Sequence, residues 1–166
     1  EVARNMVAYL AATPSRFLRL PIPRFQGQPF IGADVDANLS SERARQGLAL
    51  FVSDGLVITV THARTQRQTT ISTSTCESEI EALSWGSKIA CGMRNVVCQM
   101  FSRVGVVIKD TIDLNDDNAA ANLLARKEGD LRKIRHISLA DAYVREVSAT
   151  GSVRIFDVRS EHNRAD

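Results

Sequence analysis

Residues 70–100, TISTSTCESEIEALSWGSKIACGMRNVVCQM, carry the clearest periodic pattern in the chain. Apolar side chains recur there at spacings of three, four or seven, which is typical of one buried stripe along a helix; they are Ile80, Leu83, Ala90, Met93, Val97 and Met100. Ser74 or Thr75 is a suitable cap, and acidic residues in the first turn suit the positive end of the helix dipole. We therefore predict a long core helix that follows this cap.

The composition is that of a globular protein. The 166 residues suffice for one domain with its own core, and 44% of them are hydrophobic and 24% charged. The net charge of +2 says little about a nucleic-acid partner. No apolar run approaches a membrane span and no signal peptide is recognisable, so we expect no membrane partner. Because the sequence starts at Glu1 without a methionine, we expect it to be cut from a longer polypeptide.

The three cysteines, Cys76, Cys91 and Cys98, form no CxxC pair. This favours a reducing, intracellular compartment without disulfides. The cytoplasm and the nucleus both fit, and an organelle stays open.

Strand and helix patterns then follow along the chain. A short helix at 2–12 and a proline-containing connector at 19–29 precede the first strand. Strands are predicted at 30–37, 47–52 and 56–62, the last two joined by a hairpin at 53–55 and followed by a basic loop at 63–68. After the long helix we predict a strand within 104–118, helices at 119–126 and 138–147, and a strand at 152–158. This order predicts an α/β domain with a five-stranded mixed sheet, in which strands 1–3 are antiparallel and the later ones are added in parallel through helices.

Four acidic residues stand at strand ends or helix starts: Asp34, Glu77, Asp117 and Asp166. Such positions can converge at one edge of a sheet, and carboxylates alone form the ligand set of a hard cation such as Mg²⁺ or Mn²⁺. Two such ions ~4 Å apart are able to activate a water and hold the leaving oxygen of a phosphodiester. The alternative is that each is an ordinary surface carboxylate.

Further acids compete for the same roles, namely Asp36, Glu79, Glu81 and Asp116. Asp36 shares a strand face with Asp34, and Glu81 shares a helix face with Glu77. Strand alternation points Asp116 and Asp117 to opposite faces, so we expect only one of them to reach a metal.

Five segments, in order, resemble the ribonuclease H domain of copia-type retrotransposon polyproteins. GADVDAN at 32–38 resembles the family's Y-[ST]-D-A-D-W-A, and RQTTISTSTCESEIEAL at 67–83 resembles K-Q-x-T-V-A-L-S-S-T-E-A-E-Y-x-A-L. LNDDNAAA at 114–121 is similar to Y-C-D-N-Q-A-A-I, RHI at 135–137 to K-H-I, and DVRSEHNRAD at 157–166 to Y-V-P-T-E-x-Q-x-A-D. The opening segment resembles the end of the reverse transcriptase part. The resemblance implies a last reverse transcriptase helix and connector at 1–28 and a ribonuclease H-like domain at 29–166.

The resemblance implies an endonuclease that cuts the RNA strand of an RNA–DNA hybrid with two Mg²⁺ ions, for which Mn²⁺ substitutes. It assigns the catalytic and metal-binding roles to Asp34, Glu77, Asp117 and Asp166. Expected contacts to the hybrid come from Gln68, Asn118, Arg64, Arg67, Arg135 and His136, with Arg132 and Lys133 as further phosphate contacts. The expected partners are the hybrid and the polymerase part of the same polyprotein, within a virus-like particle. The alternative is a catalytically silent domain that serves as a structural or interaction subunit of a larger complex.

Overall fold

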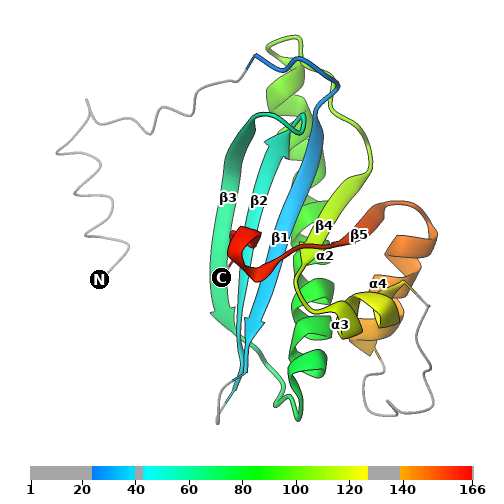
Figure 1. Ribbon diagram of the computed structural model, residues 1–166. Helices are drawn as coiled ribbons and strands as arrows, with labels where there is room; N and C mark the ends of the chain where they lie inside the picture. The colour runs from blue at the N-terminus through cyan, green and yellow to red at the C-terminus, as the bar shows by residue number, and fades with distance from the viewer. Residues whose placement is uncertain (1–23, 40–42, 127–138, 166) are drawn as a thin grey trace, which may run out of the picture.

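The computed structural model of the protein describes residues 24–39, 43–126 and 139–165. These residues form one mixed sheet with helices against one of its faces (Figure 1). The elements in chain order are β1 (Phe30–Asn38), β2 (Arg45–Ser53), β3 (Ile58–Arg67), α2 (Thr75–Ser102), β4 (Ile112–Asp116), α3 (Ala119–Ala125), α4 (Leu139–Ala149), β5 (Val153–Asp157) and the short 3₁₀ helix η2 (Ser160–His162). From β1 onward the predicted order of strands and helices is confirmed, whereas the helix predicted at 2–12 lies outside the described residues.

The sheet has the strand order β3-β2-β1-β4-β5. The first three strands are antiparallel neighbours, whereas β4 pairs in parallel with β1 and with β5. The parallel additions need crossover connections, which α2 supplies before β4 and α3 and α4 supply before β5. The five-stranded mixed sheet is therefore as the sequence predicted.

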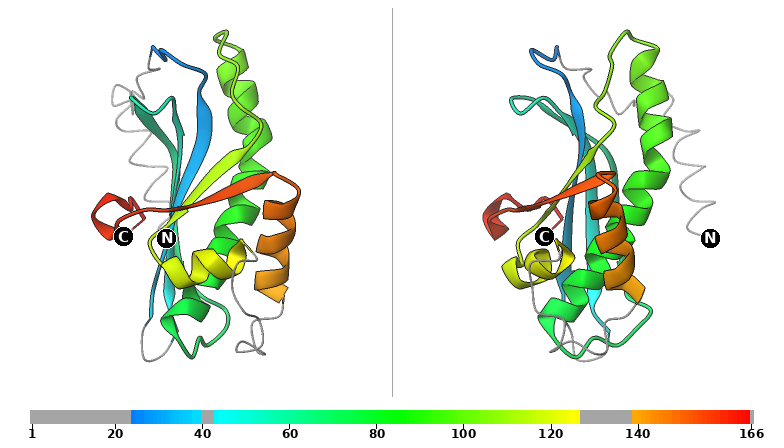
Figure 2. Two further views of the ribbon diagram at one scale, coloured as in Figure 1. Left: turned by 45° about the vertical axis from the view of Figure 1, so that its right-hand side comes forward. Right: turned by 90° about the vertical axis from the view of Figure 1, so that its right-hand side faces the viewer.

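The core lies between the sheet and α2. Alternate residues of β1, among them Ile31, Ala33 and Val35, are fully buried and belong to the same cluster as Ile80 and Leu83 of α2. The helix comes so close that a Cβ added at Gly86 would lie 2.3 Å from Val35 Cγ1, which explains a glycine inside a long helix. Figure 2 shows α2 and α4 on one side of the sheet and the C-terminal segment with η2 on the other.

Three local predictions differ from the structure. The basic stretch at 63–68 is strand as far as Arg67, because β3 continues to pair with β2 up to Arg45↔Arg67. Its position at the edge of the sheet tolerates polar and charged side chains. Met100 is exposed, because the residues that α2 buries near its end are Val97 and Phe101. The strand predicted within 104–118 starts only at Ile112 and ends at Asp116.

The hairpin between β2 and β3 is held by Asp54. Its carboxylate accepts hydrogen bonds from the backbone N–H groups of Leu56, Val57 and Gln26. These donors lower the pKa of Asp54 to about 2. Gly55 has φ +93°, a conformation that suits glycine. The turn thus forms where Ser53-Asp54-Gly55 predicted it.

Candidate metal centre

Glu79 lies in the second turn of α2, on the side of the helix that faces the sheet. Its neighbour Ile80 is part of the core, and the Glu79 side chain is itself only 5% exposed. A carboxylate is seldom buried to this extent unless it is paired or binds a metal. We therefore expect the Glu79 carboxylate to have a charged or hydrogen-bonding partner or a bound metal ion.

Two further carboxylates reach the same place from the strands. β1 and β4 run in parallel with Asp34 opposite Asn115. Two residues further along each segment stand Asp36, within β1, and Asp117, directly after β4. One carboxylate oxygen from each of Asp36, Glu79 and Asp117 lies within 4.8 Å of the other two. Parallel pairing and the start of α2 thus bring together acids from distant parts of the sequence.

Asp116 adds a fourth carboxylate beside this group. It is the last residue of β4 and points to the helix side of the sheet, like the buried Ile112 and Leu114. Its Oδ2 accepts a hydrogen bond from the backbone N–H of Asn118 at 3.2 Å. Among the described residues, only Asp117 of these two belongs to the group that could hold a metal, as expected, and Asp116 lies beside Glu79 without belonging to that group.

The electrostatics of this group are unfavourable without a cation. Burial, and then the negative charges of Asp116, Asp36 and Asp117, raise the pKa of Glu79 above its ordinary value. Burial also raises the pKa of Asp116, partly offset by the Asn118 N–H group. Both shifts favour the neutral form of a carboxyl group. The fold therefore holds these acids together against their mutual repulsion.

The oxygen atoms present fit a divalent cation. Glu79 Oε2 and Asp116 Oδ1 are buried and have no hydrogen-bond donor within the described ranges. A buried acceptor without a partner costs free energy, and so does a group of like charges. A hard divalent cation bound by carboxylate oxygens would remove both costs. Asp36, Glu79 and Asp117 are the residues that could hold it.

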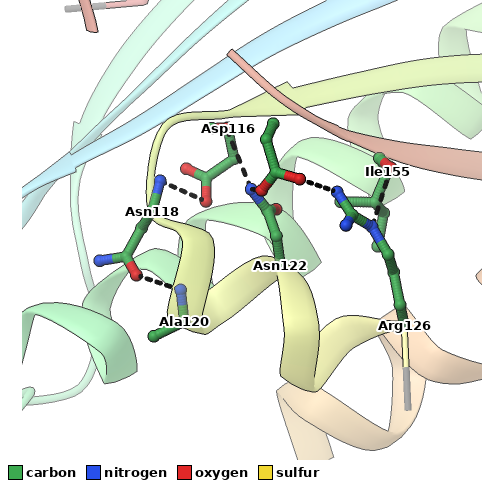
Figure 3. A network of polar contacts seen from close by, with 7 residues as sticks. Asp116, Asn118, Ala120, Asn122, Arg126 and Ile155 are labelled. Atoms are coloured by element: carbon green, nitrogen blue, oxygen red, sulfur yellow. Dashed lines mark hydrogen bonds and ion pairs between the residues drawn. The ribbon is translucent and has the colours of Figure 1, made fainter. Parts of the chain in front are cut away.

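A polar network fixes the end of β4 on which Asp116 and Asp117 stand (Figure 3). Asn118 caps α3 by accepting from the backbone N–H groups of Ala120 and Ala121. Asn122 donates to the Asp116 carbonyl at 3.0 Å and to the Asp157 carboxylate at 2.9 Å. Arg126 donates to the same carboxylate at 2.7 Å. The helix after the acids is thereby tied to both strands beside it.

Asp34 lies outside the acidic group. Its carboxylate is fully buried and accepts from Asn115 Nδ2 at 2.7 Å and from Arg164 Nη1 at 2.7 Å. The backbone N–H of Arg164 donates to the same carboxylate at 3.2 Å. Of the two aspartates that share a face of β1, the structure thus places Asp36, and not the predicted Asp34, beside Glu79 and Asp117.

Glu77 also lies outside the group, because its carboxylate serves the start of α2. Its Oε2 accepts from the backbone N–H of Thr73 at 2.6 Å and from the Thr73 hydroxyl at 2.8 Å. The Ser74 hydroxyl in turn accepts from the Glu77 N–H at 3.2 Å. This arrangement is close to a capping box, whose signature is Ser or Thr followed three residues later by Glu.

The sequence contained a signal for this difference. Ser74 and Glu77 have the capping-box spacing, which assigns Glu77 to the helix start. Glu79 precedes Leu83 by four residues and so lies on the buried stripe of the helix. No comparable local signal separates Asp36 from Asp34, since the partners of the Asp34 carboxylate, Asn115 and Arg164, are both distant in the sequence.

The residues predicted to contact nucleic acid differ in where they lie. Gln68 is 1% exposed, and its amide donates to the Ser78 carbonyl and accepts from the Ser72 hydroxyl, so it ties a loop to α2. Asn118 is the cap of α3 next to the acidic group. Arg64 and Arg67 are exposed on the edge strand β3. The remaining predicted residues lie outside the described ranges: Arg132, Lys133, Arg135, His136 and the fourth acid, Asp166.

Comparisons with known proteins agree on the fold. No protein-family model matches the chain, and no curated protein sequence matches it. Among solved structures, the N-terminal ribonuclease H domain of a Mycobacterium tuberculosis protein is 13% identical, with a TM-score of 0.55 over 80% of this chain and 84% of that one. Ribonuclease H1 of Halobacterium salinarum is 13% identical, with a TM-score of 0.56 over 81% and 89%. The foamy viral protease–reverse transcriptase, solved with an RNA/DNA hybrid, is 13% identical, with a TM-score of 0.54 over 91% of this chain and 21% of that one. The chain has a ribonuclease H-like fold.

Proposed function

We propose that this chain hydrolyses the RNA strand of an RNA–DNA hybrid with the help of bound divalent cations. The observation that carries the proposal is the group of Asp36, Glu79 and Asp117, whose oxygens lie within 4.8 Å of one another on a ribonuclease H-like fold. Solved structures of this fold include the hybrid complexes of a ribonuclease H1 and of the foamy viral enzyme. Asp36 on a strand, Glu79 on a helix and Asp117 directly after a strand hold their relative positions without the need for a loop to close.

The roles of the residues follow from their positions. Asp36, Glu79 and Asp117 would hold Mg²⁺ or Mn²⁺, with Asp166 as a further ligand on the basis of the sequence resemblance. Such ions, when bound, activate a water and stabilise the leaving oxygen of a phosphodiester. Asp116 lies behind Glu79 and increases the negative charge around it. The capping of α3 by Asn118 keeps the end of β4 in one conformation.

An edge rich in arginine lies next to the acidic group. Asp36 is opposite Gly47 of β2, which is opposite Thr65 of β3. Arg64 is adjacent to Thr65, and Arg45 and Arg67 stand opposite each other two positions further on. These side chains could neutralise phosphates of a hybrid whose scissile bond lies at the acids. A domain of this kind would recognise a hybrid by its shape and its 2′-hydroxyl groups and not by its bases.

The context of the domain belongs to the same proposal. The sequence resemblance to copia-type polyproteins supports a position after a reverse transcriptase part, with residues 1–28 as the junction. The foamy viral protein, in which the matching region is 21% of the chain, is a protease–reverse transcriptase by its name. We infer an intracellular enzyme of a retrotransposon-type particle. None of the helices in the described ranges is long and apolar enough to cross a membrane.

The experiment is the cleavage of a labelled RNA–DNA hybrid in Mg²⁺, with an RNA duplex as the control substrate. Asp117→Asn should lower the rate by more than the about 100-fold that the loss of an outer partner costs at a metal site. Asp116→Asn, the matched change one residue earlier, should lower it by about 10-fold or less. Equal losses would contradict the assignment of Asp117. A folded chain that cuts neither substrate would favour the alternative, a silent domain within a larger protein complex.

A further inference from the structure

The C-terminal segment, residues 158–165, crosses the face of the sheet opposite the helices (Figure 2). It bonds to both strands that carry the acidic group. The backbone N–H of Val158 donates to the Asp116 carbonyl at 3.1 Å, and the Ser160 hydroxyl donates to the Asp117 carboxylate. Asn163 Nδ2 donates to the carbonyl of Val35, the residue before Asp36, at 2.8 Å. The segment thus connects β1 to β4 next to the acids.

One buried ion pair fastens this segment. Arg164 Nη1 lies 2.7 Å from the Asp34 carboxylate, which is completely buried, while the arginine side chain is 38% exposed. The guanidinium also lies over the ring of Phe51, 4.9 Å from its centroid. Both carboxylate oxygens of Asp34 accept hydrogen bonds, one from Asn115 and one from Arg164. A buried charge with this many partners is held in a single geometry.

The absence of a side chain at Gly47 allows the C-terminal segment to pack against β2. A Cβ added there would be 2.5 Å from the carbonyl oxygen of Ala165, closer than such atoms approach. Gly47 is also the residue opposite Asp36 in the β1–β2 ladder. The end of the segment therefore lies directly beside the strand position that carries a proposed ligand.

We propose that Asp34 and Arg164 are positioning residues, which set the spacing of Asp36 and Asp117 by fastening the C-terminal segment across β1 and β4. Neither residue binds the metal. The inference rests on the proposed function, because it assigns a consequence for metal binding to a contact on the far face of the sheet. It also predicts that Asp34 fails as a ligand although its sequence context resembles one.

The test uses the full chain and Mn²⁺ alone as the probe. The variants are Asp34→Asn, Arg164→Ala, the double variant and Gly47→Ala. Arg154→Ala is the matched control, since Arg154 forms a similar pair with Asp113 between β4 and β5. Gly47→Ala pushes against Ala165 without changing any charge, and it provides a second test if Arg164→Ala does not fold. Calorimetric titration measures Mn²⁺ affinity, and hydrogen exchange reports the Val158 and Ala165 amides.

Arg164→Ala and Gly47→Ala should each weaken Mn²⁺ binding by about 10-fold, as the loss of an outer partner does, and speed exchange in the segment. Asp34→Asn is nearly isosteric and should weaken Mn²⁺ binding less than these two substitutions. The double variant should bind Mn²⁺ about as well as Arg164→Ala does, because the effects of substituting two residues in contact are not additive. Arg154→Ala should bind as the wild type does.

Two results would overturn the inference alone. One is a segment that exchanges faster while the Mn²⁺ affinity stays that of the wild type. The other is an Asp34→Asn variant that binds worst of all, with additive loss in the double variant, which would make Asp34 a ligand. A folded wild type that binds no Mn²⁺ would overturn the proposed function, and the inference with it.

Discussion

Exchanging one carboxylate for an amide at two positions of α2 separates a helix cap from a metal ligand. Glu77→Gln and Glu79→Gln are the same chemical change, two residues apart. Glu77 accepts two hydrogen bonds from Thr73 at 2.6 and 2.8 Å, on the outside of the helix start. Glu79 is buried beside Asp36 and Asp117. The two substitutions should therefore differ in what they damage.

The magnitude for Glu77→Gln follows from its contacts. The amide keeps one acceptor oxygen but loses the negative charge at the helix N-terminus and the charge-assisted hydrogen bonds. This should lower the free energy of unfolding by about 1 kcal/mol. For a chain of this size that corresponds to a decrease in Tm of about 2–4 °C. The rate of hybrid cleavage should stay that of the wild type.

Glu79→Gln should behave in the opposite way. It replaces a buried carboxyl group whose pKa is already raised by burial and by the acids around it, so the metal-free protein loses no favourable charge and should be at least as stable as the wild type. A ligand present at 100 times its Kd stabilises a protein by about 2.7 kcal/mol, which raises Tm by about 5–10 °C here. Mn²⁺ should produce this increase in the wild type and in Glu77→Gln, but not in Glu79→Gln.

Differential scanning calorimetry with and without Mn²⁺, together with the cleavage assay, measures both effects. The reasoning is refuted if Glu77→Gln loses the Mn²⁺-dependent increase in Tm while Glu79→Gln retains it. That outcome would restore Glu77 as the metal ligand that the sequence resemblance had indicated. Chelation with EDTA should return the wild type to its metal-free Tm, which controls for a nonspecific effect of the salt.

Two further predictions concern the surroundings of the acids. The pKa of Asp157 is lowered below 3.8 by its bonds to Arg126 and Asn122, so its contribution to stability is present above that pH and is lost as the pH falls further. Asp157→Asn should lower the free energy of unfolding by at most about 1 kcal/mol at neutral pH, since the Arg126–Asp157 pair is partly exposed. The urea midpoints of the variant and the wild type should converge in acid. A difference that stays constant with pH would contradict this. The triple substitution of Arg45, Arg64 and Arg67 to Gln should reduce the salt dependence of hybrid affinity by about 0.9 in slope for each phosphate that these side chains neutralise in the wild type. Arg103→Gln, at the distant end of α2, is the control, and an unchanged slope in the triple variant would exclude this edge from the interface.

The order of elements and the sheet could be predicted because they depend on local patterns. The hairpin signal marked the β2–β3 turn, and helical periodicity marked α2. The continuation of β3 through the basic residues up to Arg67 could not be predicted in the same way. Its partner strand, and not its own composition, supplies the hydrogen bonds that keep those residues extended.

At the candidate site, too, the sequence predicted some features and the tertiary structure decided others. The sequence by itself determined that acids would collect at the ends of β1 and β4 and at the start of α2, because secondary structure places them there. It also contained Asp117, which the structure does bring into the group. Tertiary contacts decided that Asp36 joins the acidic group and Asp34 does not, and likewise Glu79 and not Glu77. Arg164 arrives from 130 positions away to occupy Asp34, and the packing of α2 on β1 buries Glu79 while Glu77 stays at the helix cap. A local sequence pattern does not distinguish two acidic residues that are two positions apart, whereas in the folded protein each of them contacts different residues.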